Sequence, residues 1–150
     1  TALQQPVAKD LRCIATMIKI SDNYERICDL SLKIAEMTLK YEEKPLLKPL
    51  IDIPRMGGAI REMIQINDIA IKNWKPMEIK SLQEKEDYID NLYNEIYREL
   101  LTFMMKDPNT IDDATDLLFT ARYLERMADI AAKTGARIYW TITGERIWIK

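Results

Sequence analysis

Histidine is absent from the 150 residues of this chain. Its absence excludes three kinds of site within the chain: catalytic triads that use histidine, zinc held by imidazole, and the Glu-x-x-His motif of di-iron carboxylate bundles. Any metal ion that the chain binds must therefore be held mainly by oxygen ligands.

Glycine and proline are scarce, with four glycines and six prolines. The stretches between the prolines are rich in Ile, Leu, Met, Ala, Glu, Lys and Arg, all of which are compatible with helix. The composition is 47% hydrophobic and 31% charged, which is typical of a globular protein and not of a disordered one. The sequence therefore predicts an all-α protein.

The sequence also lacks long runs of like charge and long apolar runs. Acidic and basic residues are interspersed and the formal net charge is −2, which argues against a nucleic-acid partner. No apolar run reaches the roughly 20 residues of a transmembrane helix, and the first residues do not resemble a secretion signal. Cys13 and Cys28 lie about 22 Å apart on one predicted helix, too far for a disulfide. We expect a cytoplasmic protein without a transmembrane segment.

The prolines and turn residues divide the chain into four predicted helices. The first fills most of residues 1–44, from about 6 to 43, and 45–53 form a linker. The others span about 54–74, 77–106 and 110–143, and residues 145–150 form a tail. The last helix begins with a pattern like a capping box, from Thr110 to Asp113, and ends at Gly144, which suits a left-handed cap. Short connections predict that residues 54–144 form an antiparallel three-helix bundle.

Apolar residues recur at steps of three and four along the predicted helices. This spacing is typical of close helix–helix packing. In the fourth helix the stripe is Ala114, Leu117, Ala121, Leu124, Ala128, Ala131, Gly135, Ile138 and Ile142. In the third it is Ile79, Leu82, Glu86, Ile89, Tyr93, Ile96, Leu100 and Phe103. The first helix has a poorer stripe of Ile14, Met17, Ser21, Tyr24, Cys28, Ser31 and Ala35, in which we interpret Cys28 as a small core residue.

The sequence partly repeats itself after one hundred residues. Residues 24–30 match residues 124–130, with Glu, Arg and Asp at equivalent positions. We infer that the first helix belongs to a second bundle, equivalent to that of residues 54–144, whose other helices are missing. A lone long helix needs partners for its apolar face. We expect either another copy of the chain, or further helices of a longer protein, to supply them.

Three pairs of acidic residues share the spacing Glu-x-x-x-Asp. They are Glu25 with Asp29, Glu86 with Asp90, and Glu125 with Asp129. Residues four apart lie on one helix face, where two like charges repel and a cation between them is favoured. Oxygen ligands suit iron, manganese, magnesium or calcium, and also zinc. If the third and fourth predicted helices are antiparallel neighbours, their two pairs converge on one patch and can hold more than one metal ion.

The acidic pairs have a simpler interpretation as solvated surface residues. Arg26 can pair with Asp22 or Asp29, and Arg126 with Asp129, in surface ion pairs of about 0.3–0.5 kcal/mol each. Two observations favour a metal site: the motif occurs twice at equivalent positions, and Glu86 interrupts an apolar stripe, where an unpaired carboxylate is costly.

Several motifs resemble the PhoU family. Residues 5–12, with the sequence QPVAKDLR, followed by ERICD at 25–29, are similar to the family's "QPxAxDLR…ERIGD". Residues 93–108, followed by ARYLERMAD at 121–129 and ITG at 142–144, are similar to its last two helices. Cys28 and Ala128 stand where the family pattern has glycine. The resemblance covers nearly the whole chain and implies two tandem three-helix bundles, of which the first is represented here by its third helix alone.

The resemblance also implies a function. Members of the family bind multinuclear iron or zinc clusters through paired E(D)xxxD motifs, so Glu86, Asp90, Glu125 and Asp129 would form one complete site. Glu25 and Asp29 would form half of another. The family regulates phosphate uptake negatively, coupling the ATPase subunit of a phosphate ABC transporter to a sensor histidine kinase, without catalysis of its own. We also expect a homodimer, of which exchange of the long helix between two copies is one form. The alternatives are a regulatory module of another ion transporter or channel and, less favoured, a carboxylate-bridged metalloenzyme.

Overall fold

The computed structural model describes residues 4–150, and their side chains from residue 7 onward. Its helices are α1 (Gln4–Lys40), α2 (Asp52–Asn73), α3 (Leu82–Lys106) and α4 (Ile111–Thr143), with 3-10 turns η1 (Met77–Ser81) and η2 (Pro108–Thr110). Within these residues there is no strand, so the all-α prediction is confirmed. The helix bounds lie within three residues of those predicted, although the start of the third predicted helix is the separate turn η1. Residues 1–3 of the predicted segment 1–44 lie outside the described part.

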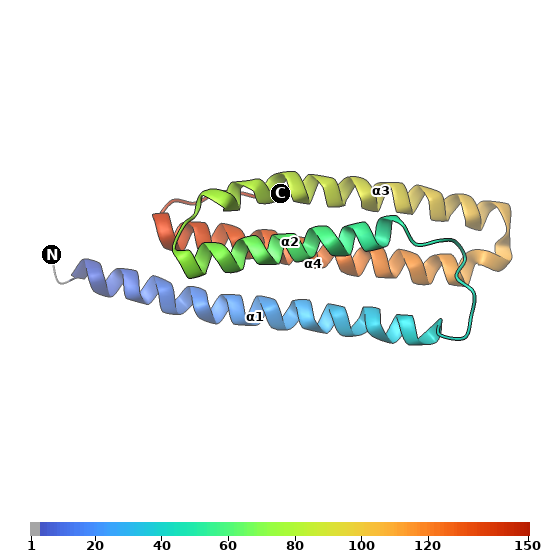
Figure 1. Ribbon diagram of the computed structural model, residues 1–150, viewed down its shortest axis with the longest axis horizontal. Helices are drawn as coiled ribbons and strands as arrows, with labels where there is room; N and C mark the ends of the chain where they lie inside the picture. Colours follow the sequence, from blue (N-terminus) through green and yellow to red (C-terminus); the bar gives the residue numbers. More distant parts are fainter. Residues whose placement is uncertain (1–3) are drawn as a thin grey trace.

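Helices α2, α3 and α4 form the predicted antiparallel bundle (Figure 1). Every residue of the α4 stripe is buried except Ile142, which is half-buried. Small residues in this stripe allow the helices to approach closely. A methyl group on Gly135 would collide with the side chain of Leu82 and would lie 2.7 Å from Oδ1 of Asn67. The alternation of small and large residues on α4 therefore sets the distance between helices.

Helix α1 runs antiparallel to α4 and, in the part of the chain that the structure describes, packs against no other helix (Figure 1). Two buried polar contacts join them: the hydroxyls of Thr16 and Thr141 lie 2.5 Å apart, and Asn23 Nδ2 donates to Thr134 Oγ1 at 2.9 Å. At the other end of α1, Tyr41 donates hydrogen bonds to carboxylates at the start of α4. The pairing of α1 with α4 is therefore fixed in register by polar contacts along its length.

The apolar stripe predicted for α1 is wrong. Ile14, Met17, Ser21 and Cys28 are exposed, so Cys28 is not a core residue. The face of α1 that packs on α4 instead carries Thr16, Asn23, Ile27 and Leu30, all buried. Two of these four residues are polar, and a search for apolar periodicity passes over them. Large apolar side chains remain exposed on the rest of α1: Val7, Leu11, Ile14, Ile18, Leu32 and Leu39.

The two ends of α4 differ in how well the sequence predicts them. Gly144 has a φ of 78° and closes α4 in the left-handed conformation, as predicted. The capping box predicted at Thr110 is not formed, because Thr110 makes no side-chain cap. The side chain of Asp107 accepts a hydrogen bond from the backbone N–H of Asn109 at 3.0 Å instead, and caps the turn η2 that precedes α4.

Across residues 4–150, no helix is long and apolar enough to cross a membrane.

Candidate metal centre

Two of the predicted acidic pairs lie near each other where α3 passes α4. Glu86 and Asp90 lie one turn apart on α3, and Glu125 and Asp129 lie one turn apart on α4. The charges of Asp90, Asp129 and Glu125 all act on Glu86, and those of Asp90 and Asp129 act on Glu125. The two acidic pairs therefore share one electrostatic environment.

Glu86 is the most deeply buried member of this carboxylate group. It is 5% exposed, and its Oε2 is buried without a hydrogen-bond partner. Burial, and after it the nearby charges of Asp90, Asp129 and Glu125, together raise the pKa of Glu86 to about 7. An acid in this position is neutral around pH 6 unless a positive charge reaches it. Glu86 belongs to the apolar stripe of α3, so the fold keeps it buried in both its charged and its neutral form.

The other members of the carboxylate group are less buried. Burial, and then the charges of Asp87 and Asp129, raise the pKa of Asp90. Burial also raises the pKa of Glu125, and the charge of Arg122 opposes this rise. Arg122 Nη1 donates to Glu125 at 2.6 Å, and Lys133 Nζ donates to Asp129 at 2.9 Å. The proposed surface pair of Arg126 with Asp129 is not formed, because Lys133, one turn along α4, occupies that carboxylate.

Asp87 is a fifth acid near this group that the sequence analysis did not identify. It adds to the raised pKa values of both Glu86 and Asp90, and it accepts a hydrogen bond from Gln83 at 2.9 Å. Asp87 lies three residues before Asp90, which places these two acids on the same side of α3. A search for Glu-x-x-x-Asp alone misses it, whereas a search for local acidic density would have found it.

The carboxylate group fits a cation in the chemistry of its donors. Four carboxylates provide hard oxygen ligands, and the unpartnered Oε2 of Glu86 is a buried acceptor that a cation would satisfy. Among the side chains that the structure describes, however, no three acids or cysteines stand close enough together to share one ion. Ion pairs with Arg122 and Lys133 now occupy the two α4 carboxylates, so binding a cation requires these side chains to move.

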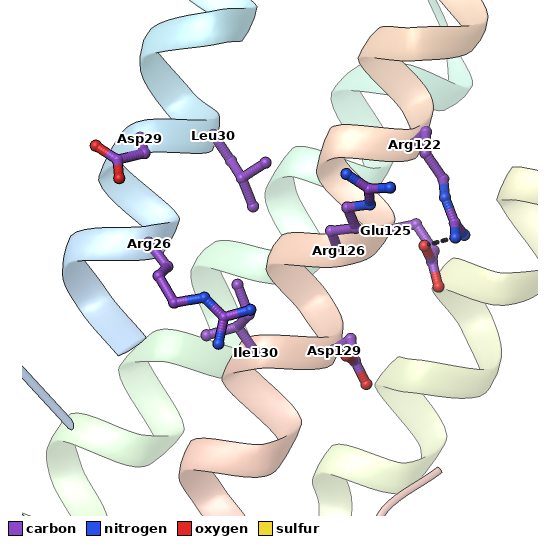
Figure 2. A pocket seen from close by; sticks show the side chains of 8 residues that line it. All are labelled: Arg26, Asp29, Leu30, Arg122, Glu125, Arg126, Asp129 and Ile130. Carbon is purple, nitrogen blue, oxygen red and sulfur yellow. Dashed lines mark hydrogen bonds and ion pairs between the residues drawn. The ribbon is translucent and has the colours of Figure 1, made fainter. Parts of the chain in front are cut away.

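A cavity of about 450 Å³ lies between α1 and α4, beside the carboxylate group. Both copies of the repeated segment line it, with Arg26, Asp29 and Leu30 opposite Arg126, Asp129 and Ile130 (Figure 2). Because α1 and α4 are antiparallel, the two copies run in opposite directions along the cavity, and Arg26 lies at the level of Ile130 (Figure 2). The repeat detected in the sequence is therefore also a spatial relationship between two packed helices.

The acidic pair of α1 does not join the carboxylate group. Figure 2 shows Asp129 on the side of α4 that faces α3, whereas Asp29 points away from α4, to the far side of α1. Glu25 and Asp29 are both exposed. Among the described residues no third acid or cysteine stands close enough to share an ion with this pair, so its role as half of a site remains a prediction.

Comparison with known proteins identifies the family. The family model described as "PhoU domain" matches residues 1–38 and 53–138. The chain belongs to the PhoU family. The chain is 33% identical over 145 residues to a protein of Deinococcus radiodurans and 38% identical over 125 residues to one of Aquifex aeolicus, both named "Phosphate-specific transport system accessory protein PhoU homolog". These alignments cover 97% and 83% of the chain, and 68% and 57% of the relatives.

Solved PhoU structures have the same fold. PhoU from Pseudomonas aeruginosa superposes with a TM-score of 0.87 at 27% identity, over 94% of this chain and 68% of that one. The phosphate transport system regulatory protein PhoU from Streptococcus pneumoniae gives 0.81 at 27% identity, over 93% and 66%. The chain thus spans roughly two thirds of the length of the PhoU proteins that it matches.

Proposed function

We propose that this chain takes part in the regulation of phosphate uptake, as a component that binds other proteins and catalyses no reaction. The observation that carries this proposal is the PhoU match over residues 1–38 and 53–138. The names of the curated relatives support it, because they describe accessory proteins of a phosphate-specific transport system. The partners proposed are the ATPase subunit of a phosphate ABC transporter and a sensor histidine kinase.

Co-purification tests the choice of partners. The chain, carrying an affinity tag, is expressed in its own cells in high phosphate, and the proteins that it retains are identified by mass spectrometry. Retention of the transporter ATPase or of the kinase supports the proposal. Failure to retain either, together with retention of a subunit of a different ion transporter, contradicts it.

Within this role, the carboxylate group of Glu86, Asp90, Glu125 and Asp129 binds cations, with an iron or zinc cluster as the first candidate and other divalent ions as alternatives. Support comes from the shared electrostatic environment of the two pairs and from the buried, unpartnered oxygen of Glu86. Arg122 and Lys133 provide the positive charge beside Glu125 and Asp129. A bound cation would replace them there and would link α3 to α4. The cation therefore stabilises the bundle or shapes the face that partners contact.

Elemental analysis of purified protein tests cation binding. We expect the wild type to carry iron or zinc and Asp129→Ala to carry less. Glu36→Ala, which removes an exposed acid from α1, is the matched control and leaves the metal content unchanged. Equal, negligible metal in all three proteins would favour surface acids held in ordinary ion pairs.

We also propose that a second copy of the chain covers the exposed side of α1, by direct contact or by exchange of the long helix. Val7, Ile18 and Leu39 are each more than 60% exposed there, and large exposed apolar side chains along one helix favour association. Sedimentation velocity should show a dimer for the wild type and a monomer for Leu11→Asp/Ile18→Asp. The control Ile69→Asp, on the half-exposed side of α2, should remain dimeric. A wild type that stays monomeric at all concentrations contradicts this.

A further inference from the structure

The segment after Gly144 has the alternation of a β-strand although it pairs with no strand. It leaves the end of α4 and runs back to α3 (Figure 1). Ile147 and Ile149 are half-buried and pack against the core, whereas Arg146, Trp148 and Lys150 are exposed. A period of two is the signature of an extended chain with one face buried.

The backbone of this segment is anchored at one point. The N–H of Lys150 donates to Gln83 Oε1 at 3.0 Å, and Gln83 Nε2 donates back to the carbonyl of Lys150. From Arg146 to Ile149, the backbone groups have no hydrogen-bond partner in the part of the chain that the structure describes. Unpaired backbone of an extended segment is available to another extended chain, which can add to it as a strand.

A cavity of about 590 Å³ lies between this segment and α4. Its apolar lining includes Ala136, Trp140, Ile147 and Ile149, and the side chain of Trp148, which is 82% exposed, stands at its edge. The cavity is large enough for a bulky apolar side chain of a partner. Backbone pairing and an adjacent apolar cavity together are what a bound strand requires.

The charges around this cavity are mostly positive. Lys133, Arg137, Arg146 and Lys150 line it, against one acid, Asp129, which pairs with Lys133. The guanidinium of Arg137 lies 4.9 Å from the ring centre of Trp140, and its buried Nε has no hydrogen-bond partner. Among the described residues neither Arg137 nor Arg146 forms an ion pair with a carboxylate. The site is therefore complementary to an acidic ligand.

We propose that residues 146–150 are a docking strand for an extended, acidic segment of a partner protein, in which carboxylates alternate with bulky apolar side chains. The main chain of that segment pairs with the unpaired backbone, an apolar side chain enters the cavity beside Trp140, and carboxylates meet Arg146 and Lys150. This site shares Asp129 with the carboxylate group. The binding test changes neither Asp129 nor a metal, so each proposal can fail without the other.

Two other occupants fit the site less well. In antiparallel self-pairing centred on Trp148, Arg146 of one copy faces Lys150 of the other, and like charges opposite each other are destabilising. A phosphate group is disfavoured because it would leave both the unpaired backbone of residues 146–149 and the apolar cavity beside Trp140 unused.

Fluorescence anisotropy tests the proposal with a labelled peptide that alternates glutamate with leucine and phenylalanine, titrated with the full chain. We expect Arg146→Glu/Lys150→Glu to raise the Kd at least about tenfold. The matched control Lys44→Glu/Lys106→Glu makes the same change of charge at the opposite end of the bundle, at exposed positions, and should change the Kd less than about twofold. Trp148→Ala should also weaken binding, because it removes apolar contact at the cavity.

Four results would overturn the proposal. If Lys44→Glu/Lys106→Glu weakens binding as much as Arg146→Glu/Lys150→Glu, the overall charge of the protein attracts the peptide, and residues 146–150 are not its specific site. If Trp148→Ala leaves the Kd unchanged, the cavity does not take part. Loss of self-association in Arg146→Glu/Lys150→Glu, without any peptide binding by the wild type, would assign the strand to a second copy. Sedimentation with phosphatidylserine vesicles, again without peptide binding, would assign it to a membrane surface.

Discussion

Asp129 on α4 lies close enough to Glu86 on α3 for its charge to be among the causes of the raised pKa of Glu86. Burial is the largest cause, and the charge of Asp90 comes next. The two helices that bring these acids together are held by a core of small and branched apolar residues, which does not depend on the acids themselves. The fold therefore imposes a cluster of negative charge, and the following predictions test what that cluster does.

The first prediction concerns pH. The pKa of Glu86 is about 7 in the folded protein, against 4.5 for an ordinary glutamate. The folded state therefore holds this proton more tightly, so its stabilising contribution is complete below about pH 4.5 and is lost as the pH rises through 7. In metal-free protein, Glu86→Gln should remove this loss, which amounts to as much as about 3 kcal/mol.

Urea unfolding of both proteins in the presence of a chelator measures this effect. Relative to the wild type, the free energy of unfolding of Glu86→Gln should increase between about pH 5 and pH 8. Glu84→Gln, at an exposed position of the same helix, serves as the control. Parallel pH profiles for wild type and Glu86→Gln would show that Glu86 does not titrate in this range.

The second prediction concerns competition between side chains and cations. Arg122 occupies Glu125 at 2.6 Å, so a cation must displace it. Arg122→Gln should therefore bind Zn²⁺ or Mn²⁺ more tightly, by about two- to fivefold, since an exposed ion pair contributes about 0.2–1 kcal/mol. Titration against a fluorescent chelator measures the affinity. Arg61→Gln, an exposed change on α2, should have no effect, and weaker binding in Arg122→Gln would mean that Arg122 helps to form the site.

The third prediction concerns the spacing of helices in the bundle. Gly135→Ala places a methyl group against Leu82 and Asn67 and should destabilise the fold by about 1–3 kcal/mol. Gly57→Ala is the matched control: a methyl group there meets nothing within 4 Å, and alanine should stabilise α2 by about 0.5–1 kcal/mol. Thermal unfolding of both variants gives the comparison. A neutral Gly135→Ala would show that α4 and its neighbours can move apart at little cost.

The fourth prediction concerns the attachment of α1. Asn23 donates to Thr134 inside the α1–α4 contact, at 2.9 Å. A double-mutant cycle with Asn23→Ala and Thr134→Ala should give a coupling energy of about 0.5–1.5 kcal/mol. The exposed Asn94→Ala on α3 should show no coupling to Thr134→Ala. A coupling energy of zero between Asn23 and Thr134 would mean that the register of α1 on α4 has another origin.

Much of the bundle is predictable from the sequence because the packing stripes of its helices consist almost entirely of apolar and small residues. The small and apolar residues of α4 recur without interruption, and Gly144 has a conformation that few other residues adopt. The face of α1 was not predictable by the same reasoning, because Thr16 and Asn23 carry its contact with α4. Apolar side chains such as Ile14 and Ile18 lie outside that contact, so counting apolar residues selects the wrong side.

The sequence was sufficient to predict that the acidic pairs of α3 and α4 lie near each other, but not which basic side chain pairs with each acid. The spacing of Glu86, Asp90, Glu125 and Asp129 identifies one face on each of two neighbouring helices. The partners of those acids depend on the directions of long, flexible side chains, which spacing does not fix. Arg126 and Lys133 are both close to Asp129 in sequence, and only the structure shows that Lys133 is the one that pairs with it. The contribution of Asp87 follows from local charge density.

Anomalous diffraction from crystals equilibrated with zinc or iron tests the central claim most directly. The account predicts anomalous peaks between α3 and α4, with carboxylate oxygens of Glu86, Asp90, Glu125 and Asp129 at about 2.0–2.2 Å from the metal and with Arg122 and Lys133 displaced. Peaks that occur only at other acids, with the pairs of Arg122 with Glu125 and Lys133 with Asp129 intact, would contradict it.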